Sequence, residues 1–110
     1  RAGVGKRIDV RVGNAHDLLR KTSGKFDLIF NDVDKQQYPE SLRVALPKLR
    51  RGGLFVTDNT LWSGKAARLA APDDLQTRGI QEFNQLVYAS KELYPVLIPL
   101  RDGVTVCRKN

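Results

Sequence analysis

A chain of 110 residues has the length of one small domain. Apolar residues make up 41% of it and charged residues 28%, a composition typical of a folded globular protein rather than a disordered or fibrous one. The single Cys107 excludes a disulfide framework and a zinc site built from Cys and His, and the longest apolar runs are far too short to span a membrane. Because the sequence starts at Arg1 and contains no Met, we expect it to be a piece of a longer protein.

The net charge of +7, from 19 Lys and Arg against 12 Asp and Glu, raises the question of nucleic-acid binding. The excess is spread along the chain except in two clusters, Arg1-Lys6-Arg7-Arg11 and Arg50-Arg51, and the aromatic residues lie in apolar runs. Nucleic-acid modules usually gather their charge on one face and add aromatic side chains for stacking. The pattern favours a solvated basic surface. A nucleic-acid-binding module and a non-catalytic interaction domain are kept as alternative functions.

Short apolar runs alternate with helical patterns along the first third of the chain. Apolar and charged residues alternate over residues 8–12, which predicts a half-buried strand that ends at Gly13-Asn14. A short helix is predicted over residues 15–21. Residues 26–30 read Phe-Asp-Leu-Ile-Phe and predict a buried strand.

A second helix is predicted to begin at Pro39, because proline is favoured in the first turn of a helix. Its apolar face would consist of Leu42, Ala45, Leu46 and Leu49. Pro47 lies inside this pattern and is expected to shorten or kink the helix, since proline cannot donate the backbone hydrogen bond. Gly52-Gly53 then ends the unit, and residues 54–57 predict another buried strand.

Residues 60–74 are predicted to form a long loop with a turn at Ser63-Gly64. Asp73 or Asp74 can cap the helix that follows, whose core stripe would be Ile80, Phe83, Leu86 and Val87. Two strands, over residues 94–100 and 104–108, close the chain as a hairpin. The order of elements predicts an α/β fold whose sheet is parallel for most of its width and ends in an antiparallel hairpin.

Polar residues follow each of the first three predicted strands. They are Asn14, Ala15 and His16 after the first strand, Asp32, Asp34 and Lys35 after the second, and Asp58 and Asn59 after the third. Ligands of open α/β sheets bind beyond the carboxyl ends of the strands. Carboxylate and amide oxygens suit a hard divalent cation such as Mg²⁺ or Ca²⁺. The same residue types are also common helix caps and turn formers, so on spacing alone both interpretations stay open.

Three segments, residues 26–38, 54–64 and 95–109, resemble the cation-dependent O-methyltransferases of the caffeoyl-CoA and catechol type. The resemblance extends over nearly all of residues 4–109. It implies that residues 1–110 are the C-terminal part of a Rossmann-like methyltransferase fold, a partial O-methyltransferase domain that holds the metal and catalytic half. The family's glycine-rich cofactor loop has no counterpart here, so we expect this chain alone to be inactive.

The resemblance also implies roles for single residues. Asp32, Asp58 and Asn59 match the family's protein ligands for Mg²⁺ or Ca²⁺. Asp32 is also expected to be catalytic, and Lys35, three residues later, matches a lysine that serves as a base or as a charge partner of the phenolate. As a base it would need a depressed pKa, because an ordinary lysine is protonated at neutral pH.

Contacts with cofactor and substrate follow from the same resemblance. Ala15 and Asp34 match positions that contact S-adenosylmethionine, Ala15 near its adenine, and Asn14 and His16 are expected close to the same end of the cofactor. Ser63 falls at a polar substrate contact, and Trp62 is expected either to wall the aromatic substrate or to pack against its own domain. The implied protein is a cytoplasmic homo-oligomer that acts on a small aromatic hydroxyl substrate, with no nucleic-acid or membrane partner.

The resemblance also implies a strand order of 3-2-1-4-5-7-6, in which residues 8–12 form strand 3 and residues 26–30 form strand 4. This chain contains neither strand 1 nor strand 2. Strand 4 would therefore have a bare apolar edge, which is prone to pair with any available strand. We expect residues 8–12 to move beside strand 4, or the bare edge to pair with a second copy of the chain.

Overall fold

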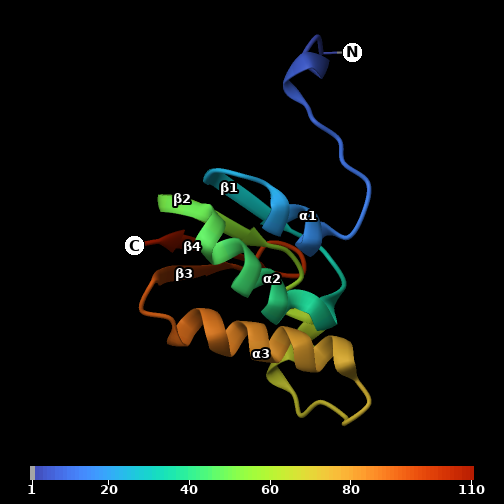
Figure 1. The fold of residues 1–110 in the computed structure, drawn as a ribbon. Helices are drawn as coiled ribbons and strands as arrows, with labels where there is room; N and C mark the ends of the chain where they lie inside the picture. The colour runs from blue at the N-terminus through green and yellow to red at the C-terminus, as the bar shows by residue number, and fades with distance from the viewer. Residues whose placement is uncertain (1) are drawn as a thin grey trace.

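The computed structural model describes residues 2–110, so Arg1 of the first basic cluster lies outside the described residues. Its elements are the helices α1 (Ala15–Lys21), α2 (Tyr38–Ala45) and α3 (Leu75–Ala89) and the strands β1 (Phe26–Asn31), β2 (Leu49–Thr57), β3 (Leu93–Ile98) and β4 (Val104–Lys109) (Figure 1). Short 3₁₀ segments lie at Gly5–Arg7, Lys35–Gln37, Leu46–Lys48 and Trp62–Ala67. Among the described helices, none is long and apolar enough to cross a membrane.

The four strands form one sheet in the order β1-β2-β4-β3. Strands β1 and β2 are parallel, with Asn31 opposite Thr57, whereas β4 is antiparallel to both β2 and β3. The mixed α/β fold, the parallel pair and the closing hairpin confirm the predicted fold class, although only one of the three strand pairings, β1 with β2, is parallel.

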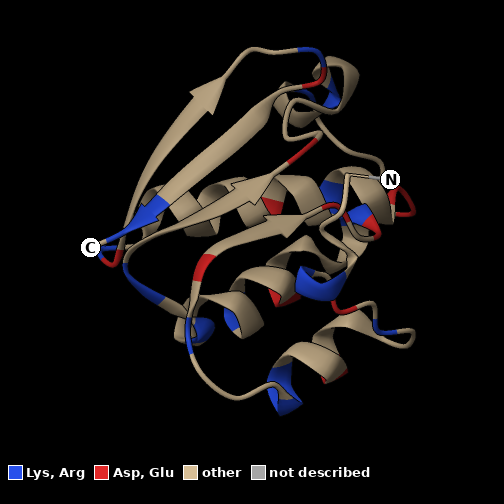
Figure 2. Cartoon of the chain, turned by 90° about the horizontal axis from the view of Figure 1, so that it is seen from above, with Lys and Arg blue, Asp and Glu red and all other residues tan. Residues whose placement is uncertain are grey.

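The three helices cover one face of the sheet, as the view from above shows (Figure 2). Between the layers lies a core in which the ring of Phe83 meets the rings of Tyr38 and Phe55 edge to face, at centroid distances of 5.5 and 6.2 Å. Of the predicted stripe on α3, Ile80, Phe83 and Val87 are fully buried and Leu86 packs against them half-buried. The period of apolar residues therefore located the inner face of α3 correctly.

The opposite face of the sheet carries apolar side chains that no described layer covers. Phe30 of β1 lies in register with Val56, and Val106 lies opposite both Val56 and Val96. Phe30 and Val96 are 59% and 47% exposed. Parallel strands of α/β proteins are usually buried on both faces, so this face is unusually apolar for a solvated surface.

Residues 8–12 do not form the predicted strand. They belong to no sheet, and the apolar side chains of Ile8, Val10 and Val12 are 60%, 80% and 97% exposed. An alternating pattern becomes a strand only where a neighbouring strand accepts its hydrogen bonds, and the described chain offers none at this position. The expectation that this segment moves beside β1 is therefore wrong, and pairing of that edge with a second copy stays a prediction.

The second predicted helix is shorter than its apolar pattern. Helix α2 ends at Ala45, and the chain tightens into the 3₁₀ segment Leu46–Lys48 around Pro47, which has no N–H to continue the α-helix. Leu49, expected on the helix, instead begins β2 and is buried there. Gly52-Gly53 lies within β2 rather than ending a unit, beside an irregularity in its pairing with β1.

Asp74, rather than Asp73, caps α3. Its Oδ1 accepts a hydrogen bond from Thr77 N at 3.1 Å, and its Oδ2 accepts one from Thr77 Oγ1 at 2.7 Å. These two hydrogen bonds lower the pKa of the Asp74 carboxyl below its usual value. A folded-state pKa below the unfolded one adds stability above the ordinary pKa of Asp, and this contribution is lost as the pH falls through the lowered pKa.

We therefore predict that Asp74→Ala lowers the urea midpoint of unfolding at pH 7, because the cap is lost. The difference from the wild type should narrow below a pH of about 3.9, where the unfolded-state carboxyl takes up its proton. Asp73→Ala is the matched control and should leave the midpoint unchanged. Equal shifts for the two variants would contradict the assignment of the cap.

Candidate functional site

The parallel pairing of β1 and β2 brings two aspartates to one edge of the sheet. Asn31 and Thr57 lie opposite each other as the last residues of the two strands, so Asp32 and Asp58 both follow directly at the same edge. The backbone N–H of Asp58 donates to the carbonyl of Asn31 at 3.3 Å, which continues the contact beyond the strands. Asn59 is next in the chain. The three predicted metal ligands thus lie at one end of the sheet.

Lys35 leans back over this edge. Its Nζ lies 2.6 Å from Asp32 Oδ1 and 5.0 Å from the centroid of the Tyr38 ring, and its side chain is only 12% exposed. Burial by itself lowers the pKa of the amine, but the hydrogen bonds with Asp32 and Tyr38 outweigh it, so the pKa of Lys35 is raised. In this arrangement the amine keeps its proton at neutral pH. The ion pair with Asp32 places the positive charge of Lys35 at this edge, as the charge-partner role requires.

Tyr38 contacts the backbone at this edge of the sheet and was not among the predicted site residues. It is completely buried, and its hydroxyl donates to the backbone carbonyl of Asp58 at 2.7 Å. Burial raises the pKa of Tyr38, with the charges of Asp32 and Asp58 acting in the same direction. The phenol therefore stays a neutral donor at neutral pH. Its position at the end of the segment 26–38 was the signal available in the sequence.

Asn59 adopts a left-handed backbone conformation, with a φ of 60° that Asn tolerates better than most residues. Its backbone N–H donates to Asp58 Oδ1 at 2.7 Å, and its Nδ2 donates to Asp102 Oδ2 at 3.2 Å. The other oxygen of Asp102 accepts from the backbone N–H of Ser63 at 2.5 Å. Asp102 therefore belongs to the site, although the sequence indicated only a hairpin turn there.

The donor set fits a hard divalent cation. Among residues 2–110 there is no cluster of three or more His, Cys, Asp or Glu able to hold a metal, so a centre here would rest on two carboxylates and one amide. All three are oxygen donors, the type that Mg²⁺ and Ca²⁺ prefer, and Mg²⁺ commonly keeps several waters besides its protein ligands. Asp32 is about half exposed, which leaves the site accessible from solvent.

Three of the predicted cofactor residues, Asn14, Ala15 and His16, lie at the start of α1, and the fourth, Asp34, lies in the loop after β1. Asn14 caps α1, because its Oδ1 accepts from Asp17 N at 3.0 Å, while Asp34 is exposed before the 3₁₀ segment. Ala15 and His16 line a small cavity of about 70 Å³ together with Asn31. His16 Nε2 is 2.7 Å from Ser41 Oγ, and the buried Asn31 has an Nδ2 without a hydrogen-bond partner. The structure groups Ala15 and His16 but leaves Asn14 and Asp34 outside this cavity.

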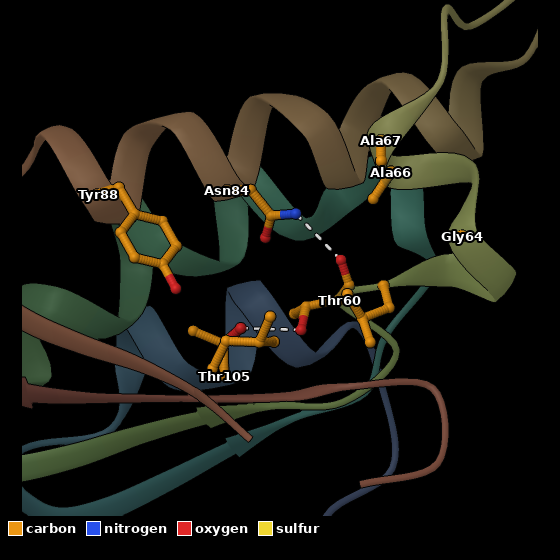
Figure 3. A pocket seen from close by; sticks show the side chains of 9 residues that line it. Thr60, Gly64, Ala66, Ala67, Asn84, Tyr88 and Thr105 are labelled. Carbon is orange, nitrogen blue, oxygen red and sulfur yellow. Dashed lines mark hydrogen bonds between the residues drawn. The ribbon is translucent and has the colours of Figure 1, made fainter. Parts of the chain in front are cut away.

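The loop after Asn59 is fixed from behind by α3 and β4. The backbone carbonyl of Thr60 accepts a hydrogen bond from Asn84 Nδ2 at 3.0 Å (Figure 3). The hydroxyl of Thr60 lies 2.8 Å from Thr105 Oγ1, and both threonines line a cavity of about 230 Å³. None of the predicted site residues lines this cavity. Trp62 packs half-buried against the core, whereas Ser63 is exposed. For Trp62 the structure therefore agrees with packing against its own domain.

Backbone strain gathers at this end of the molecule. The non-glycine residues of the described chain with positive φ are Asn59, Trp62, Ser63 and Arg101, all in the loop after β2 or in the β3–β4 turn that it contacts. Such conformations persist only where the surrounding contacts determine them. The contacts of Asp102 and Thr60 supply that constraint.

Helix α3 holds the segment that carries Lys35. Gln76 Oε1 accepts from the backbone N–H of Lys35 at 3.0 Å. One turn later, Gly79 is buried against the same segment, where a Cβ atom would overlap the Lys35 carbonyl and lie 2.5 Å from Gln36 Cα. Only a glycine lets the helix approach this closely. The position of Lys35 therefore depends on a residue 44 positions away in the chain, at Gly79.

Comparison with known proteins adds independent information about this arrangement. A family model described as O-methyltransferase matches residues 1–110. The caffeoyl-CoA O-methyltransferase of Petroselinum crispum is 36% identical over 120 residues, which cover 99% of this chain and 50% of that protein.

Two solved structures share the fold. One from Klebsiella pneumoniae, assigned as an O-methyltransferase, has a TM-score of 0.90 at 30% identity and covers 98% of this chain and 52% of its own. The O-methyltransferase of Bacillus cereus in complex with SAH has a TM-score of 0.83 at 26% identity, covering 93% and 50%. The chain thus spans about half the length of these relatives.

The close approach at Gly79 makes a prediction. Gly79→Ala should destabilise the protein by about 1–3 kcal/mol, because the added methyl group overpacks a closed interface. It should also change the amide chemical shifts of Lys35 and Gln36. Gly5→Ala is the control, since a Cβ there meets no atom within 4 Å. Unchanged stability of the Gly79 variant would contradict the packing described here.

Proposed function

Because the chain belongs to the O-methyltransferase family, we propose that it is the metal and catalytic part of an S-adenosylmethionine-dependent O-methyltransferase. Its acceptor would be a catechol-like or other small aromatic hydroxyl compound. The family match over the whole chain supports the reaction class, the parsley relative supports a phenolic acceptor, and the SAH bound to the Bacillus cereus neighbour supports the cofactor. The convergence of Asp32, Asp58 and Asn59 on one sheet edge is the observation that carries the proposal.

In this proposal Asp32, Asp58 and Asn59 hold one divalent cation, Mg²⁺ or Ca²⁺. Such a cation, when bound, lowers the pKa of an acceptor hydroxyl so that the phenolate forms near neutral pH. Lys35 contributes a buried positive charge beside Asp32, where it stabilises negative charge that develops on the acceptor oxygen. Tyr38 keeps its proton and holds the carbonyl of Asp58, which keeps the second ligand loop in place.

The cofactor would bind on the α1 side of the edge. We assign Ala15 and His16 to its adenine end, with Asn14 and Asp34 as further contacts, and the small cavity beside His16 supports the first two. Ser63 would meet the acceptor, with Trp62 behind it. We further propose that the complete protein is a cytoplasmic homo-oligomer with neither a nucleic-acid nor a membrane partner.

Charge distribution favours the enzyme over a nucleic-acid-binding module. Lys and Arg are scattered over several elements rather than gathered on one face (Figure 2). Several of them are engaged with carboxylates, as in the pairs Arg20–Glu40, Arg43–Glu82 and Arg50–Asp27. A phosphate-binding surface would instead leave such groups free on one side.

The proposal predicts the effect of removing one ligand. In the complete enzyme that carries this chain, Asp58→Ala should lower the rate of methyl transfer to catechol at least about a hundredfold, because the cation supplies several kcal/mol of charge stabilisation. A chelator should inhibit the wild type to a similar degree. Asp27→Ala, which removes an exposed carboxylate of β1, is the control and should keep full activity. An Asp58→Ala variant with full activity, together with a wild type that the chelator does not inhibit, would contradict the proposal.

A further inference from the structure

The turn between β3 and β4 docks onto the loop that carries Asn59. The backbone N–H of Leu61 donates to the Asp102 carbonyl at 2.9 Å, and that of Thr60 donates to the Gly103 carbonyl at 3.1 Å. Gly103 has a φ of 81°, and a Cβ there would lie 2.6 Å from Leu61 Cγ, so the approach requires glycine. The two segments are more than forty residues apart in the chain but form one rigid corner.

The carboxylate of Asp102 lies inside this corner and has two fixed donors. Its Oδ1 accepts from the backbone N–H of Ser63 at 2.5 Å, and its Oδ2 accepts from Asn59 Nδ2 at 3.2 Å. An ionised carboxylate can only accept hydrogen bonds, so it must face the amino group of Asn59 rather than its carbonyl oxygen. Asp102 thereby fixes which way the Asn59 amide is turned.

The orientation matters because only one atom of this amide can bind a cation. With Nδ2 held by Asp102, the oxygen Oδ1 is the atom of Asn59 left for a ligand, whereas a flipped amide would present an amino group. We propose that Asp102 is a positioning residue that selects the cation-binding orientation of Asn59. This inference rests on the proposed cation centre. It adds a residue that contacts neither the cation nor the acceptor.

A competing explanation is that Asp102 attracts the cation only through its negative charge. The two explanations predict different cation affinities for two isosteric substitutions, Asp102→Asn and Asn59→Asp, tested singly and together. The backbone N–H of Ser63 can only donate a hydrogen bond, so the amide introduced at position 102 must direct its oxygen to Ser63 and its amino group to residue 59. The Asn59 amide would then have to flip, and Asp102→Asn should weaken cation binding about 10- to 100-fold.

The double variant reverses this effect under the positioning role. A carboxylate at position 59 accepts from the introduced amino group and leaves one oxygen for the cation, so the donor–acceptor pattern is restored. Binding should then be at least about tenfold tighter than the product of the two single effects predicts. If Asp102 acts only through its negative charge, the effects of the two substitutions on the free energy of cation binding should be additive.

The test is a double-mutant cycle on the 110-residue chain. The dissociation constant of Mn²⁺ is measured by titration calorimetry for the wild type, both single variants and the double variant. Thermal unfolding of each variant in chelator establishes that it is folded and measures the contact between residues 59 and 102 without metal.

Each outcome of the cycle decides the question. Coupling of about tenfold or more supports the positioning role. Additivity within about twofold, with Mn²⁺ bound by the wild type, overturns it and leaves the cation centre intact. A wild-type chain that binds no Mn²⁺ contradicts the proposed function itself, and the inference falls with it.

Discussion

The parallel hydrogen bonding between β1 and β2 is the constraint on which the candidate site depends. Parallel strands end at the same edge, so the register that sets Asn31 opposite Thr57 also brings Asp32 and Asp58 together. If one strand slipped by one residue, all of its side chains would move to the other face of the sheet. The remaining contacts of the site hold the two loops that this pairing creates.

Three supports hold these loops, and each comes from a distant part of the chain. Tyr38 donates to the carbonyl of Asp58, Gly79 lets α3 press on the segment of Lys35, and Asp102 holds Asn59. Precise placement of catalytic groups needs such rigid surroundings, because small displacements cost large factors in rate. The surroundings are polar and tight at this edge, whereas the uncovered face of the sheet is apolar and open.

Local patterns in the sequence predicted most elements and placed Asp32, Asp58 and Asn59 just after two strands, because strand ends and helix stripes are encoded by neighbouring residues. The ligand role of these three residues came from the family resemblance and stays a prediction. The prediction of a strand over residues 8–12 was wrong, because a strand also needs a neighbouring strand and the local pattern of residues does not provide one. The prediction that Leu49 lies on the second helix was wrong, because the helix ends before Pro47 although the apolar spacing continues to Leu49. Tyr38 and Asp102 were missed for a related reason. Their roles arise from contacts across 20 and 43 positions, which only the folded chain brings together.

We propose that Asp32, Asp58 and Asn59 form one cation centre. Anomalous X-ray scattering from crystals of this chain grown with Mn²⁺ tests it most directly. We expect one strong peak within about 2.0–2.6 Å of an oxygen of each of the three side chains. A peak at other residues, or none at this edge at Mn²⁺ concentrations well above those in the cell, would contradict it.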